Sequence, residues 1–223
     1  MSSKGVTFYF VRHGETYLNR YNRMQGWSNA PLTPEGIEDV HRSGRGLKDI
    51  HFDAVYTSDL MRTIDTAKII LDENASSSTL TIHPMPEFRE VGFGSHEGLP
   101  ARDIWEEADA TARLHHDLPE GTEVEIKHFL DTLAELDPYH DAENYATFWQ
   151  RVESGLLTLL NRHAGTDETI LVVCHGLTIR NLLHGLVADF DEKEALENAS
   201  VSIVDYRGGQ FKMEAYNQTD HFI

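Results

Sequence analysis

The sequence has little cysteine and no long apolar run. Cys174 is the only cysteine in 223 residues, so no intramolecular disulfide can form, as is typical of a chain from a reducing compartment. No segment approaches the ~20 consecutive apolar residues of a membrane-spanning helix. The apolar run after Gly5 is too short for a signal peptide. We therefore expect a soluble, cytoplasmic protein with no membrane partner.

Positive charge is also scarce. Lysine and arginine number 19 against 37 aspartates and glutamates, which gives a formal net charge of 19 − 37 = −18. Such a field repels nucleic acid, so none is expected as a partner. It also repels phosphate esters, so a phosphate site would have to be a local cationic pocket. With 40% hydrophobic residues, the chain can bury the core of one large domain.

Metal-binding patterns are missing as well. The chain has 13 histidines, but none stands at ligand spacing with a matching set of acids or cysteines. His115, His116, His128 and His140 lie in an acidic segment and are expected to be solvated. We therefore expect no metal site and no required cofactor.

Apolar runs rich in β-formers alternate with helical patterns. Strands are expected at 6–11, 52–57, 79–83 and 169–174, and helices at 34–47, 58–71, 145–163 and 177–187. This alternation predicts a three-layer α/β/α fold with a mostly parallel central sheet. Two further runs, at 201–206 and 210–216, flank Gly208-Gly209 and predict an antiparallel C-terminal edge hairpin.

The segment at about 99–145 differs in character. Residues 101–147 hold 13 acidic residues against three lysines or arginines, and the helical pieces at about 101–114 and 123–136 are amphipathic. We interpret this segment as a helical cap inserted into a single domain of residues 1–223. The free edge of the predicted sheet is compatible with a homodimer.

Two apolar strands end in the same dipeptide, His13-Gly14 in one and His175-Gly176 in the other. If the strands are parallel neighbours, both histidines emerge at the carboxyl edge of the sheet, where ligands bind in such folds. A third strand end supplies Ser58, with Arg62 one helical turn further on. Ser58 either caps that helix or belongs to the same site.

These residues fit the chemistry of phosphoryl transfer. Two guanidiniums, from Arg12 and Arg62, match the oxygens of a phosphoryl group. One neutral imidazole can attack phosphorus and carry the group covalently, while the other stabilises the developing charge. The leaving oxygen also needs an acid. Glu87 and Glu90 are both candidates, because burial and the charge of the phosphate raise the pKa of a nearby carboxyl group.

The motifs together identify a family. The segment Arg12-His13-Gly14-Glu15-Thr16 resembles the signature of the histidine phosphatase superfamily, the phosphoglycerate mutase-like proteins. Four further blocks follow in the family's order over residues 6–180: Asn19 with Gln25-Gly26-Trp27-Ser28-Asn29-Ala30-Pro31-Leu32-Thr33, Ser58-Asp59-Leu60-Met61-Arg62-Thr63 with Thr66-Ala67, Phe88-Arg89-Glu90 with Gly94, Glu97 and Gly98, and Val173-Cys174-His175-Gly176.

The resemblance implies a role for each site residue. His13 would be the phosphorylated nucleophile, and Glu90, four residues before Gly94, would be the proton donor. The residues implied to hold the phosphoryl oxygens are Arg12, Arg62 and His175. Those implied to line the phosphate and substrate side are Thr16, Asn19, Gln25, Gly26, Ser58 and Gly176. The substrate would be a small phosphorylated metabolite, and inorganic phosphate or sulfate could occupy the site.

A rival motif overlaps the second histidine. Cys174 and Arg180 satisfy the Cys-x5-Arg spacing of cysteine-dependent phosphatases, in which a thiolate attacks phosphorus. The loop between them holds Leu177 and Ile179 and runs into a predicted helix, and Cys174 ends a fully apolar strand. A thiol there should be buried and inert. We therefore favour His13 as the nucleophile.

Three functions remain open within the resemblance. Glycolytic mutases of this family carry Glu-Arg-His-Tyr-Gly at the acid block, whereas this chain reads Glu90-Val91-Gly92-Phe93-Gly94. Without that arginine and tyrosine, and with an acidic insert, phosphomonoester hydrolysis is favoured over a mutase reaction. The alternative from a different class is a non-catalytic module that binds a phosphorylated ligand.

Overall fold

The computed structural model describes residues 4–119, 121–190 and 194–219. They contain one six-stranded sheet with the strand order β3-β2-β4-β1-β5-β6. The strands are β1 (Gly5–Arg12), β2 (Ala54–Thr57), β3 (Ile82–Pro84), β4 (Thr169–Cys174), β5 (Val201–Arg207) and β6 (Gln210–Gln218). The first four are mutually parallel, and β5 and β6 form the antiparallel edge. The predicted fold class is thus confirmed.

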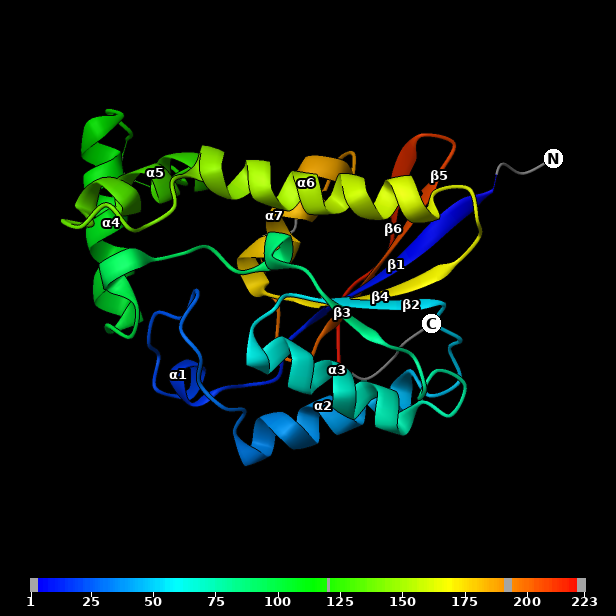
Figure 1. Ribbon diagram of the computed structural model, residues 1–223. Helices are drawn as coiled ribbons and strands as arrows, with labels where there is room; N and C mark the ends of the chain where they lie inside the picture. The colour runs from blue at the N-terminus through cyan, green and yellow to red at the C-terminus, as the bar shows by residue number, and fades with distance from the viewer. Residues whose placement is uncertain (1–3, 120, 191–193, 220–223) are drawn as a thin grey trace.

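Helices cover both faces of this sheet. The helices of the described residues are α1 (Tyr17–Arg20), α2 (Pro34–Gly46), α3 (Met61–Glu73), α4 (Ala101–His115), α5 (Ile126–Leu136), α6 (Tyr145–His163) and α7 (Gly176–Leu186), with the short 3-10 turns η1 (Pro86–Phe88) and η2 (Gly94–His96). Figure 1 shows α2 and α3 on one face and α6 and α7 on the other. In the same view α4 and α5 lie beyond the carboxyl ends of the parallel strands.

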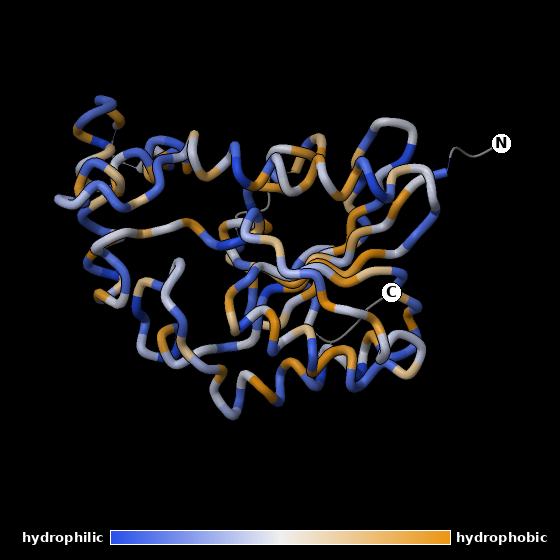
Figure 2. Tube along the Cα trace, viewed as in Figure 1, coloured by the Kyte–Doolittle hydropathy of each residue, from blue (hydrophilic) through white to orange (hydrophobic). Residues whose placement is uncertain are grey.

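The core explains this layering. Strand β4 is fully buried over Ile170–Cys174 because it lies in the middle of the sheet between β1 and β2. Alternate side chains of the strands enter two apolar clusters, one on each face of the sheet. Figure 2 shows the apolar strands at the centre and polar stretches on the outer turns of the helices. Buried on both faces, β4 reads as a continuous apolar run, which is why its bounds were predictable.

Several predicted elements are displaced. The strand expected at 52–57 begins at Ala54, because the backbone N–H of Phe52 donates to Oγ of Ser77 and leaves the sheet ladder. The strand expected at 79–83 is Ile82–Pro84, because the N–H of Leu80 closes a turn onto the Ser77 carbonyl. These two strands are therefore shorter than predicted.

The helix expected to be capped by Ser58-Asp59 starts later. It begins at Met61 with Leu60 as N-cap, which makes no side-chain cap, and the N–H of Met61 donates instead to Oδ1 of Asn29 at 3.2 Å. The prediction of a Ser58 cap is therefore wrong, since the Ser58 hydroxyl contacts another partner in the site. By contrast, Thr33 is the N-cap of α2, with Gly36 N–H donating to its Oγ1 at 3.0 Å.

Within the described residues, no helix combines the length and apolar character needed to cross a membrane. The same ranges contain no group of three or more His, Cys, Asp or Glu side chains arranged to hold a metal ion.

Candidate active site

The site lies at the carboxyl ends of the four parallel strands. His13 and His175 follow β1 and β4, and Ser58 follows β2. The sheet bonding continues one step past the strands, because His13 N–H donates to the Cys174 carbonyl and Ser58 N–H to the Val173 carbonyl, each at 3.1 Å. The two imidazole centroids consequently lie 5.2 Å apart in an edge-to-face arrangement. The expected juxtaposition of the two histidines is present.

His13 is buried and held in one tautomer. Its Nδ1 lies 2.8 Å from the Gly14 carbonyl, which can only accept, so this nitrogen carries the hydrogen. Nε2 therefore has a free lone pair, and Nε of Arg62 donates to it at 3.2 Å. Burial, followed by the charges of Arg62 and Arg12, lowers the pKa of His13 well below its ordinary value. The imidazole is thus neutral, as a nucleophile must be.

Arg62 lies at the centre of the cluster and is 1% exposed. Its Nη1 and Nη2 donate to the carbonyls of Ser28 and Gly26 at 3.0 and 2.7 Å, and Nη2 also lies 3.0 Å from Nδ1 of His175. Burial lowers the pKa of Arg62 to about 10. The guanidinium remains charged at neutral pH, and both histidines lie against it.

A carboxylate holds the loop to which Arg62 bonds. Glu97 accepts the backbone N–H groups of Gly26, Trp27 and Ser28, at distances of 2.7–3.3 Å. A side chain at Gly26 would approach the Val91 carbonyl to 2.0 Å, so only glycine fits where this loop crosses. Gly26 thus acts on the site through its carbonyl group, which accepts a hydrogen bond from Arg62.

His175 is fully buried and joined to Ser58. Its Nε2 lies 2.8 Å from Oγ of Ser58, which in turn lies 2.8 Å from Oγ1 of Thr63. Thr63 donates to backbone carbonyls, so the Ser58 hydroxyl donates to Thr63 and accepts from His175. Burial lowers the pKa of His175 well below its ordinary value. Ser58 lies behind the second imidazole, an arrangement that leaves Nδ1 of His175 facing Arg62.

Arg12 has an unused buried donor. Its Nη1 donates to the Leu196 carbonyl, but its buried Nε has no partner among the described residues. A Cβ built on Gly176 would lie 3.4 Å from that Nε. Burial lowers the pKa of Arg12 from its ordinary value. A buried N–H without a partner is uncommon in native proteins, and an anion placed beside Gly176 would satisfy it.

Glu90 is the acid that the fold brings to the cluster. Its carboxyl group accepts from the backbone N–H groups of Leu177 and Thr178, at the start of α7, at 3.0 and 3.1 Å. Burial raises the pKa of Glu90 above its ordinary value, against the opposing effect of these hydrogen bonds. Glu87, the other candidate, does not line the cavity beside Arg12, whereas Glu90 does.

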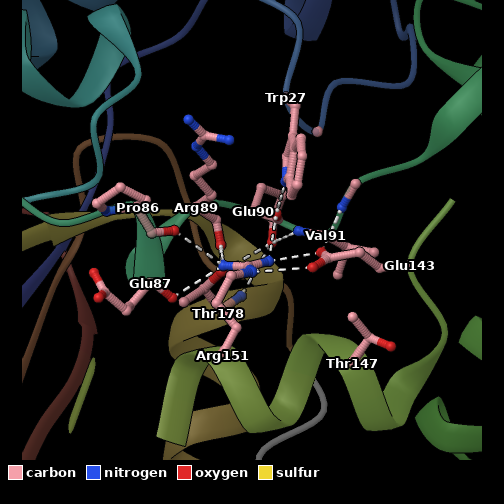
Figure 3. A network of polar contacts seen from close by, with 12 residues as sticks. Trp27, Pro86, Glu87, Arg89, Glu90, Val91, Glu143, Thr147, Arg151 and Thr178 are labelled. Carbon is pink, nitrogen blue, oxygen red and sulfur yellow. Dashed lines mark hydrogen bonds and ion pairs between the residues drawn. The ribbon is translucent and has the colours of Figure 1, made fainter. Parts of the chain in front are cut away.

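A cluster of contacts holds the Glu90 segment in place (Figure 3). Nη1 of Arg151, from α6, donates to the carbonyls of Glu87 and Arg89 at 2.9 and 3.0 Å. Nη2 of Arg151 and Nε1 of Trp27 both donate to the carbonyl of Glu90, at 3.1 and 2.9 Å. The backbone of the proton-donor candidate is thus fixed from two sides.

Glu143 completes this arrangement. It binds Arg151 through both carboxylate oxygens at 3.0 and 2.6 Å, and it accepts the backbone N–H of Gly92 at 2.9 Å. Nothing in the sequence pattern indicated Arg151 or Glu143. Each lies more than 50 positions from the segment that it holds, and neither belongs to a local motif.

A cavity of about 300 Å³ adjoins the cluster at Arg12 and Glu90. Of the sequence-predicted residues, His13, Gly26, Ser58, Arg62 and His175 are not part of its lining, whereas Arg12, Asn19, Gln25, Glu90 and Gly176 line it. Thr16 does not. It is fully buried, and its hydroxyl lies 2.6 Å from Oε1 of Gln25 and 3.0 Å from Oδ1 of Asn19. Thr16 thus contacts the lining residues from behind.

Cys174 is buried at the end of β4, and burial raises the pKa of its thiol above the ordinary value. A thiol held in its neutral form is a poor nucleophile. This geometry does not suit the cysteine-dependent alternative.

Fold and site together define an α/β protein with a buried histidine–arginine cluster at the carboxyl edge of its sheet. The chain belongs to the histidine phosphatase superfamily (branch 1), whose family model matches residues 8–219. The resemblance seen in the motifs is thus confirmed.

Relatives carry the names of both mutases and phosphatases. A probable phosphoglycerate mutase GpmB from Yersinia pestis is 31% identical over 202 residues, covering 89% of this chain and 84% of that protein. The crystal structure of a phosphoglycerate mutase from Bacillus anthracis superposes with a TM-score of 0.86 at 33% identity, covering 98% of this chain and 95% of the other. An α-ribazole phosphatase from Shigella flexneri gives 0.73 at 25% identity, with 97% and 98% covered.

Proposed function

We propose that this protein is a phosphomonoester hydrolase that acts on a small phosphorylated metabolite through a covalent phosphohistidine on His13. The observation that carries the proposal is the fixed tautomer of His13. Its Nδ1 hydrogen is held by the Gly14 carbonyl, and its Nε2 lone pair points at Arg62. No metal or cofactor is needed for this chemistry, and we propose none.

In the first step Nε2 of His13 attacks phosphorus. A nitrogen–phosphorus bond forms, the phosphorus–oxygen ester bond breaks, and the leaving oxygen takes the proton of Glu90. Arg62 exchanges its bond to Nε2 for a phosphoryl oxygen, and the free Nε of Arg12 binds another. His175 stays neutral, with Nε2 bonded to Ser58 and its Nδ1 lone pair toward Nη2 of Arg62, and so orients that guanidinium for the phosphoryl group.

In the second step water attacks the phosphohistidine. The Glu90 carboxylate takes a proton from the water, the nitrogen–phosphorus bond breaks, and inorganic phosphate leaves. Neutral His13 and protonated Glu90 are restored. The same carboxyl group therefore acts as acid and then as base.

The side chains around Glu90 favour water as the acceptor. Where glycolytic mutases of this family carry arginine and tyrosine, this chain has Val91, which is 1% exposed, and Phe93, which packs edge-to-face on Trp105. Neither can bind a second anionic acid. These apolar groups support hydrolysis over transfer to a second phosphoglycerate.

The test is a panel of phosphorylated metabolites with wild type and His13→Ala at mildly acidic pH. Hydrolysis by the wild type alone, with acid-labile phosphate trapped on the protein, would support the proposal. Binding of phosphorylated ligands without turnover of any of them would instead identify a binding module.

The names of the relatives support a second candidate, a phosphoglycerate mutase. That reaction predicts isomerisation of 3-phosphoglycerate to 2-phosphoglycerate without release of phosphate. Detecting isomerisation at a rate above that of hydrolysis would favour the mutase and overturn hydrolysis as the main activity.

A further inference from the structure

A second and larger cavity adjoins the site. Its volume is about 560 Å³, and it lies between the start of α5 and the exposed side of α7. Two residues of α7, Leu177 and Arg180, line both this cavity and the one that contains Arg12 and Glu90. The two spaces thus meet at these side chains.

Leu177 places the second cavity on the leaving-group side. Its backbone N–H donates to Oε2 of Glu90 at 3.0 Å. In the proposed mechanism Glu90 protonates the leaving oxygen, so the alcohol part of the substrate must begin beside this carboxyl group. From there the shared wall formed by Leu177 leads into the second cavity.

Arg180, the other residue that lines both cavities, has no hydrogen-bond partner among the described residues. Among the described residues it makes no hydrogen bond or ion pair, and its Nε is buried. It stands three positions after Leu177 on α7, about one helical turn further from Glu90. A guanidinium group that lines a cavity and lacks an acceptor is uncommon and favours an anionic ligand.

We propose that Arg180 is a specificity-determining residue, which binds a carboxylate on the alcohol part of the substrate. This inference rests on the proposed hydrolase function of the same site. The substrate class is a phosphomonoester whose alcohol carries a carboxylate joined by a partly apolar spacer. Leu177, Phe129 and Ile126 provide the apolar lining for the spacer.

A carboxylate fits better than a second phosphate group. Glu123 and Glu125, two exposed residues, outnumber the single lysine, Lys127, in the lining of the larger cavity. Their charges disfavour a dianion more strongly than a monoanion. The planar fork of an arginine binds a carboxylate through two parallel hydrogen bonds.

The test compares two aryl phosphates of nearly equal shape, 4-carboxyphenyl phosphate and the neutral 4-carbamoylphenyl phosphate. We expect the wild type to prefer the carboxylate, and Arg180→Gln to lower the ratio of the two kcat/KM values by roughly ten- to hundredfold. Arg180→Lys should retain part of the ratio. The control is Arg45→Gln, which removes the same charge from an exposed position on α2 and should leave the ratio unchanged.

The preference for a carboxylate is also measured without turnover. The ratio of the affinities for 4-carboxybenzylphosphonate and 4-carbamoylbenzylphosphonate gives it, because a CH₂ group replaces the ester oxygen in both compounds. Equal effects of Arg180→Gln and Arg45→Gln on both ratios would overturn the role of Arg180. If the wild type hydrolyses neither aryl phosphate nor any metabolite of the panel, the hydrolase proposal fails. The phosphonate affinities then still decide whether Arg180 binds a carboxylate.

Discussion

Nε of Arg62 donates to Nε2 of His13 at 3.2 Å, so the guanidinium occupies the lone pair that would attack phosphorus. The same guanidinium reaches Nδ1 of His175. A bound phosphoryl group would separate these partners and take over the donors of Arg62. The cluster is therefore already assembled in this structure, and little rearrangement is needed to bind substrate.

Removing the nucleophile should abolish activity, whereas removing the thiol should not. We expect His13→Ala to lower kcat for p-nitrophenyl phosphate by on the order of 10³-fold or more. Cys174→Ser, which alters a neutral buried group, should retain most of the activity. Steady-state kinetics and trapping of labelled phosphate on the protein provide the measurement. The reverse pattern would identify Cys174 as the nucleophile.

Replacing the proton donor should have an effect that depends on the leaving group. Glu90→Gln should slow hydrolysis of alkyl phosphates by about 10²–10⁴-fold. Hydrolysis of p-nitrophenyl phosphate should suffer less, because nitrophenolate leaves without a proton. Single-turnover rates of phosphorylation with both substrates would measure this. An equal loss for both would exclude Glu90 as the acid, and Glu87→Gln serves as the matched control.

The pH profile of kcat/KM should have an alkaline limb that belongs to Glu90. Burial raises the pKa of this carboxyl group above its ordinary value of 4.5, and the protonated form is the active acid. Activity should therefore fall as pH rises through the raised pKa. His13, whose pKa lies well below 6.5, is neutral at these pH values and limits activity only in stronger acid.

The variant Glu90→Gln provides the check on this profile. It should lose the alkaline limb while the acid limb remains. An alkaline limb that persists unchanged in Glu90→Gln would assign that limb to a different group.

Arg151 should affect both stability and the proton-transfer step. Its side chain and that of Glu143 are 17% and 8% exposed, so Arg151→Met leaves a nearly buried carboxylate without its cation. Loss of one partner of a buried pair costs about 3–5 kcal/mol. We expect a lower free energy of unfolding in urea and, in the folded fraction, a lower kcat for alkyl phosphates at similar KM.

The exposed Arg162, on the same helix α6, supplies the control variant Arg162→Met. It should change neither quantity appreciably. A purely structural role for Arg151 would lower stability while leaving the pH profile and the dependence on the leaving group as in wild type.

The parts of the site that lie directly at strand ends could be predicted from sequence. His13 and His175 each follow an uninterrupted apolar run, and parallel strands bring such positions to one edge. Arg151 could not be predicted, because its partners at 87, 89 and 90 are more than 60 positions away and are reached only through the packing of α6. The strand bounds near Phe52 and Leu80 were also hidden, since Ser77 bonds to the backbone there.

The central place of β4 has a consequence for how this protein can be studied. The groups of the cluster follow the four parallel strands, which are far apart along the chain. Strand β4 is one of them and lies between β2 and β1. A sheet in which β4 is unpaired cannot bring the whole cluster together. Catalytic turnover would therefore report the concentration of chains whose four parallel strands are paired, and its recovery after dilution from denaturant would time that pairing.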